Sequence, residues 1–92
     1  MPRHEEDLYG ALKKDLGKSR MESYMCEIGL TLSELTWMEK HIRRLTREKR
    51  VPTPLAQFAA RSFQSSTPYG TVLIMSPWNY PVLLTLEPLI DA

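Results

Sequence analysis

The chain has 92 residues, which is room for one small domain, and its 12 basic and 11 acidic side chains give a formal net charge of +1. That balance argues against a nucleic-acid binder that is basic throughout and against an acidic tail. A hydrophobic fraction of 42% argues against wholesale disorder, while the single cysteine, Cys26, excludes an internal disulfide framework and leaves no recognisable pattern of metal ligands.

From the composition, we expect no targeting or membrane segment at either end of the chain. The N-terminal residues lack the apolar core of a secretory signal, and prolines and polar residues interrupt the most apolar stretch, residues 70–92. We therefore predict no membrane span. With one cysteine and no signal, a reducing, cytoplasmic setting is expected.

A first amphipathic helix is predicted near the N-terminus. Leu8, Leu12 and Leu16 recur every four residues, acidic side chains precede them, and lysines lie near the end of the segment. Gly17 supplies a C-terminal stop.

A second, longer helix is predicted from about Ser19 to about Arg47. Ser19 and Glu22 have the spacing of a capping box. Glutamates such as Glu27 lie mostly off the apolar stripe. That stripe consists of Met21, Tyr24, Met25, Ile28, Leu32, Leu35, Met38, Ile42 and Leu45.

The second half of the chain has the order strand, strand, turn, helix. Prolines within 51–54 end the long helix, and residues 58–66 predict a strand followed by a turn at 67–70. The β-branched, apolar run 71–75 is typical of a strand buried in a parallel sheet. Pro81 fits the first position of a last helix, although Pro88 disfavours its continuation. Strand, tight turn and helix make half of a βαβ unit that ends within an apolar helix, which suggests a fragment.

Two features could carry chemistry, but each has a simpler interpretation. Residues 40–50 hold six basic side chains against one acidic, which could contact phosphates but also complement the dipole at a helix C-terminus. Cys26 could be a nucleophile only beside a base, and its neighbour Glu27 is not a histidine. We interpret residues 40–50 as a solvated helix end and therefore expect no nucleic-acid partner. We interpret Cys26 as a structural thiol.

The most unusual segment is Ser76-Pro77-Trp78-Asn79-Tyr80-Pro81, at the carboxyl end of the predicted strand, where α/β sheets place ligands. Asn79 offers an uncharged amide donor that could hold a developing oxyanion. Trp78 offers a flat apolar wall. On the residues alone, a structural turn with a packed Trp78 is the simpler alternative.

Residues 70–92, through this Pro-Trp-Asn-Tyr-Pro string, closely resemble the start of the cofactor domain of NAD(P)-dependent aldehyde dehydrogenases. Residues 15–19 and the helix after them resemble the class-3-like (fatty aldehyde) branch of that superfamily. The resemblance extends from about Leu8 to Ala92.

The resemblance implies an α/β fold of which this chain is an N-terminal fragment. The expected parts are two helices, a strand pair, and the first strand and helix of a Rossmann-like domain. Residues 1–50 would be an N-terminal helical segment, and 51–92 the incomplete start of the NAD(P)-binding domain. The residues implied for the site are Met75, Ser76, Pro77 and Trp78 at the dinucleotide, Asn79 as the oxyanion donor and Tyr80 at the aldehyde tunnel.

In this family a cysteine thiolate attacks the aldehyde, hydride passes to NAD(P), and a glutamate serves as base in hydrolysis of the thioester to the acid. The residues that match that cysteine and glutamate are absent from this chain, which looks truncated at both ends. The isolated chain is therefore expected to be inactive, to bind no NAD or NADP, and to self-associate or aggregate. The whole enzyme is expected to be a homo-oligomer. A small helical protein-interaction module is the alternative.

Overall fold

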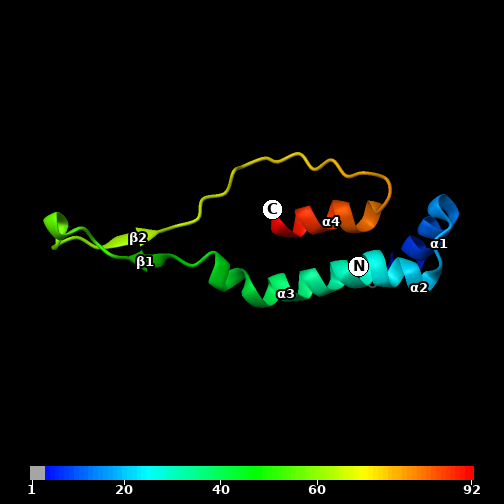
Figure 1. Cartoon of the computed structure of the whole chain (residues 1–92), viewed down its shortest axis with the longest axis horizontal. Helices are drawn as coiled ribbons and strands as arrows, with labels where there is room; N and C mark the ends of the chain where they lie inside the picture. The colour runs from blue at the N-terminus through cyan, green and yellow to red at the C-terminus, as the bar shows by residue number, and fades with distance from the viewer. Residues whose placement is uncertain (1–3) are drawn as a thin grey trace.

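Helices dominate the computed structural model, which describes residues 4–92 (Figure 1). In chain order the elements are α1 (Glu5–Leu16), α2 (Arg20–Ser23), the π-helical η2 (Tyr24–Ile28), α3 (Gly29–Leu45), β1 (Lys49–Val51), the 3-10 turn η3 (Leu55–Gln57), β2 (Ser62–Gln64) and α4 (Pro81–Asp91). Helix α4 packs along α3, and the two strands form an arm that projects away from the helices (Figure 1).

The described chain is elongated. It measures 64 × 24 × 19 Å with a radius of gyration of 19.6 Å, whereas a compact chain of this length would have about 12 Å. Its fully buried apolar core is correspondingly small and consists of Tyr9, Leu12 and Ile28. Large apolar side chains such as Leu73 and Leu55 are 81% and 91% exposed.

Helix α1 confirms the first predicted helix. Leu12 is buried against Ile28 and the half-buried Leu8. Gly17 ends the helix in the left-handed conformation at φ 68°, and its N–H donates to Lys13 O at 3.0 Å. The glycine is needed there because a positive φ is strained for residues with a Cβ.

The long helix is also confirmed, because helical residues run without a break from Arg20 to Leu45. Ser19 caps it by accepting a hydrogen bond from Glu22 N at 3.2 Å. The predicted buried stripe is wrong at its start, where Met21, Tyr24 and Met25 are 74%, 50% and 62% exposed. It is also wrong at its end, where Ile42 and Leu45 are exposed.

Polar residues take the place of that stripe. Ser23, Glu27 and Thr31, four residues apart, are fully buried. The π-helical turn η2 lies within this stretch and inserts an extra residue into the helix, so the spacing of a regular α-helix does not predict the buried face across it. In the described part of the chain, every buried polar side-chain atom has a hydrogen-bond partner.

A strand pair is present, but its members differ from those expected. Within 58–66 only β2 is a strand, and it pairs antiparallel with β1, directly after the long helix. The register places Arg50 opposite Phe63 and Val51 opposite Ser62. Strand β1 was not predicted, because Lys49 and Arg50 continue a charged run that carries no strand signal.

The predicted strand over 71–75 does not form. These residues run in the unpaired trace that returns from β2 to α4 (Figure 1). A strand exists only through hydrogen bonds to a neighbour, and within residues 4–92 no strand pairs with this run. The apolar sequence is suited to a sheet, but the described chain provides no partner for it.

Helix α4 confirms the last predicted helix, with Pro81 in its first turn. Pro88 lies inside it without ending it, since Ala92 N donates to Pro88 O at 3.0 Å. Because proline has no N–H, the helix lacks the bond that would reach back to Leu84 O.

A surface ion pair joins α1 to α2. Arg20 binds both carboxylate oxygens of Glu6, at 2.5 and 2.6 Å, and its guanidinium lies 4.3 Å from the centroid of the Tyr9 ring. The hydrogen bond and charge of Arg20 hold the pKa of Glu6 below its ordinary value.

The two helical glycines should respond oppositely to alanine. At Gly29 an added Cβ would lie 2.8 Å from Tyr24 O and 3.2 Å from two of its ring carbons, whereas at Gly10 nothing lies within 4 Å. We expect Gly29→Ala to destabilise the chain by about 1–3 kcal/mol through overpacking. Gly10→Ala should stabilise it by about 0.5–1 kcal/mol through helix propensity. Thermal unfolding followed by circular dichroism measures both; a stabilising Gly29→Ala would contradict the close approach.

Arg20→Ala should raise the pKa of Glu6 towards its ordinary value. Because the folded-state pKa is lowered, the pair stabilises the fold above the ordinary pKa of a glutamate, and this contribution is lost as the pH falls through the folded value. A carboxyl-carbon NMR titration measures the change. Lys13→Ala, which removes a cation that does not contact Glu6, is the control and should leave the titration unchanged.

Candidate functional site

The residues that the sequence singled out lie together at the start of α4. Residues 76–81, the 76–81 loop, join the unpaired run to the helix (Figure 1). Met75 and Trp78 are 84% and 85% exposed, Asn79 is also exposed, and Tyr80 is 39% exposed. The simpler reading of Trp78 as a packed structural residue is therefore not what this structure shows.

Beneath the loop lies a buried ion pair, the Lys18–Glu27 pair. Lys18 is 8% exposed and Glu27 is fully buried, and Lys18 Nζ donates to Glu27 Oε1 at 2.5 Å. Taking two charges out of water is costly, so each ion needs the other and further hydrogen bonds. Removing one partner of such a pair typically costs about 3–5 kcal/mol, because the remaining charge is left buried.

The second carboxylate oxygen of Glu27 binds the N-terminus of α4. Its Oε2 accepts hydrogen bonds from Val82 N at 2.8 Å and Leu83 N at 3.4 Å. These amides have no partner within their own helix, and Tyr80, at the N-cap position, provides no side-chain acceptor. A carboxylate there also complements the positive end of the helix dipole. Glu27 is thus the cap of a helix that begins more than fifty residues later.

Lys18 reaches the loop itself. Its Nζ donates to the backbone oxygen of Asn79 at 2.9 Å and lies 4.1 Å from the centroid of the Tyr80 ring. The second contact is a cation–π interaction. The lysine therefore binds the residue that the resemblance assigns to the oxyanion and the aromatic residue after it.

Hydroxyl groups hold the loop from the side of α4. Ser76 Oγ and Thr85 Oγ1 lie 2.6 Å apart, and the Thr85 hydroxyl donates to Pro81 O at 2.6 Å. With prolines at 77 and 81 restricting the backbone, the loop is fixed at both ends and at Asn79.

The sequence did not reveal Lys18 or Glu27 as part of this site. The sequence pattern puts Glu27 off the apolar stripe of its helix, and the family resemblance of residues 15–19 assigns no role to Lys18. The available signal was weak: Ser23, Glu27 and Thr31 recur every four residues beside the buried Ile28.

The loop exposes groups that can contact a ligand. The side-chain amide of Asn79 can donate to an oxygen that gains negative charge. The residues assigned to the dinucleotide do not enclose one by themselves, because Met75 and Trp78 are exposed and the Ser76 hydroxyl is engaged with Thr85. A nucleotide bound there would need its other contacts from outside residues 4–92.

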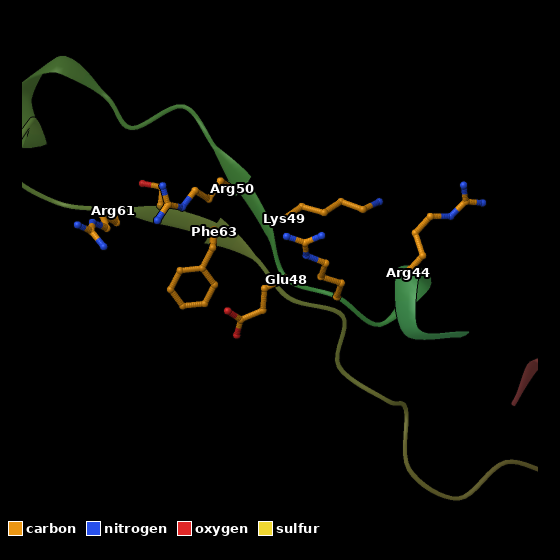
Figure 2. A pocket seen from close by; sticks show the side chains of 8 residues that line it. Arg44, Glu48, Lys49, Arg50, Arg61 and Phe63 are labelled. Carbon is orange, nitrogen blue, oxygen red and sulfur yellow. The ribbon is translucent and has the colours of Figure 1, made fainter. Parts of the chain in front are cut away.

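The basic residues lie elsewhere, around a hollow of about 690 Å³ at the base of the arm. Figure 2 shows cationic side chains from the end of α3 and from the hairpin, with Phe63 and Glu48 beside them. The lining residues are Arg44, Arg47, Glu48, Lys49, Arg50, Arg61, Ser62 and Phe63. Nearly all of these side chains are exposed, which agrees with the interpretation of this region as a solvated surface.

Cys26 is a free, half-buried thiol in η2. Across residues 4–92 no cluster of three or more histidine, cysteine, aspartate or glutamate side chains could hold a metal ion. None of the helices described is long and apolar enough to cross a membrane.

Comparison with known proteins identifies the family. The sequence profile of the aldehyde dehydrogenase family matches residues 1–92. The chain belongs to this family. It is 46% identical over 89 residues to the 4,4'-diaponeurosporen-aldehyde dehydrogenase of Staphylococcus aureus, covering 97% of this chain and 19% of that protein. It is 41% identical over 85 residues to human aldehyde dehydrogenase family 3 member B1, covering 92% and 18%.

The fold of this chain also has a solved counterpart. The substrate-bound structure of S. aureus AldH matches it with a TM-score of 0.93 at 45% identity, over 97% of this chain and 19% of that one. The resemblance to the class-3-like branch and the expected fragment of the aldehyde dehydrogenase fold are thereby confirmed. The chain spans about a fifth of the length of these relatives.

Proposed function

We propose that this chain forms part of an NAD(P)-dependent aldehyde dehydrogenase that oxidises an aldehyde to a carboxylic acid, and that its contribution to the chemistry is the donor Asn79. The observation that carries the proposal is the fixed 76–81 loop. It presents an exposed, uncharged amide on a backbone held by Lys18 and by the N-terminus of α4.

The role of Asn79 follows from the charge that develops on the aldehyde oxygen. When a thiolate adds to the carbonyl carbon, that oxygen becomes an anion, and a pre-positioned N–H donor stabilises it by about 3 kcal/mol in a dry site. A neutral amide suits this task because it does not bind the ground-state substrate as a fixed charge would. Tyr80 would border the path of the aldehyde.

The rest of the machinery would come from chain beyond these residues. Cys26 lies within a helix and is not the nucleophile in this proposal, and the catalytic cysteine and glutamate would be supplied elsewhere. NAD or NADP would accept the hydride, with Met75, Ser76, Pro77 and Trp78 as one wall of its site. The division at residue 50 between a helical segment and a Rossmann-like domain, the homo-oligomer and the cytoplasmic location also remain predictions.

The exposed apolar surface supports this assignment. The run 71–75 has the composition of an inner strand but is mostly exposed, and the chain is far less compact than a complete domain of its length. Both features are expected of a segment that packs against further chain.

A chimera tests the proposal directly. Replacing the matching segment of the S. aureus enzyme by this chain should give an enzyme that reduces NAD(P) when supplied with that enzyme's aldehyde. The isolated 92-residue chain should give no turnover. A folded but inactive chimera would contradict the proposal, as would turnover by the isolated chain that survives Cys26→Ala.

Within the chimera, Asn79→Ala should lower kcat by about 10²–10³ with little change in the KM for the cofactor, because the donor acts in the transition state. Gln57→Ala is the matched control, since it removes an exposed side-chain amide on the arm far along the chain from the loop. Steady-state kinetics measure both. An unchanged kcat for Asn79→Ala would remove Asn79 from the oxyanion role.

A further inference from the structure

The Lys18–Glu27 pair lies outside the Pro-Trp-Asn-Tyr-Pro string, yet its contacts converge on it. One ion binds the carbonyl of Asn79 and the other binds the amides of Val82 and Leu83. The two ions are bound to each other at 2.5 Å. A single buried unit therefore holds the backbone on either side of Tyr80 and Pro81.

We propose that Lys18 and Glu27 are positioning residues for Asn79, which set the direction of its side-chain amide through the backbone without touching the reacting atoms. This inference rests on the proposed function, because it gives the pair a catalytic effect only if Asn79 is the oxyanion donor.

The geometry explains how such control would operate. A peptide unit is planar, so fixing the oxygen of Asn79 fixes the plane that joins it to Tyr80. The amide of Val82, bound at 2.8 Å, fixes the chain three residues further on. That plane includes the Cα of Asn79, and on the N-terminal side of Asn79 the Ser76 hydroxyl is bound to Thr85. The backbone dihedral angles of Asn79 are thus restricted from both sides, and they decide which rotamers its side chain can adopt.

Charge makes the pair suited to positioning. Hydrogen bonds that involve ions are short and directional, whereas apolar contacts allow sliding. The Glu27 carboxylate also has few alternative positions, because it is fully buried and each of its oxygens is already bound. Small errors in the placement of a catalytic group are costly, and a displacement of about 1 Å can reduce the rate about 10²-fold.

The chain provides a matched control. The Glu6–Arg20 pair also links the N-terminal helices, with an N–O distance of 2.5 Å, but its side chains are 74% and 63% exposed. Its hydrogen bonds join α1 to α2 and do not reach the loop. It thus separates a general effect of losing an ion pair from an effect on Asn79.

The test is a double-mutant cycle in the chimeric enzyme. We expect Lys18→Met and the isosteric Glu27→Gln each to lower kcat by about 10-fold or more, with the KM for the cofactor changed less than about 2-fold. Glu6→Gln and Arg20→Met should leave both unchanged. In the Asn79→Ala background, Lys18→Met and Glu27→Gln should lower kcat no further, because a positioning residue acts only through the group it positions.

Each outcome decides a separate point. If Asn79→Ala lowers kcat but neither pair variant does, the positioning role is wrong and the proposed function stands. A pair variant that lowers kcat equally with and without Asn79 has a structural role only, which also overturns the inference. An unchanged kcat for Asn79→Ala removes the proposed function and the inference together. Each kcat is calculated per folded enzyme, using only the protein that elutes in size-exclusion chromatography at the position of the unmodified chimera. If Lys18→Met does not fold, Glu27→Gln alone tests the inference.

Discussion

A buried salt bridge, together with a small apolar core, joins the separate parts of this chain. The core of Tyr9, Leu12 and Ile28 links the helices, with Leu32 and Val82 packed against it. The Lys18–Glu27 pair adds the 76–81 loop, because Lys18 in the turn after α1 binds Asn79 O and Glu27 in η2 binds the start of α4. The pair exists because each ion satisfies the other and because α4 begins with free amides that need an acceptor. In turn, the position of α4 is set by the Glu27 carboxylate that accepts these hydrogen bonds.

This arrangement separates the structural task from the chemical one. The N-terminal helices carry no residue of the proposed reaction, yet they provide the groups that hold the loop. The loop keeps Asn79 and Tyr80 accessible while its backbone is tied on both sides. Functional side chains on a loop supported by a rigid scaffold are a common solution, and here the support comes from residues more than fifty positions away in sequence.

Local chemistry decided which predictions from the sequence were successful. Gly17, Ser19 and Pro81 mark helix ends through their own backbone preferences, and the structure confirms all three. The strand at 71–75 was wrong because pairing depends on a neighbour, not on composition. The same reason explains why Glu27 was missed: a carboxylate becomes a buried cap only when a distant helix presents its amides. The family resemblance assigns a role to Asn79, whereas it assigns none to Lys18, although residues 15–19 also carry the resemblance, and none to Glu27.

The unpaired run before the loop has a consequence for solubility. Residues 71–75 are mostly apolar, β-branched in part and mostly exposed, and their backbone forms no strand pairing within residues 4–92, so it can join a strand of another molecule. Pro68 and Pro77 stand on either side of this run. A proline cannot donate a ladder hydrogen bond, so the two residues act as gatekeepers that limit how far intermolecular pairing can spread. The same Pro77 that stiffens a candidate catalytic loop thus also limits the length of strand with which another molecule could pair.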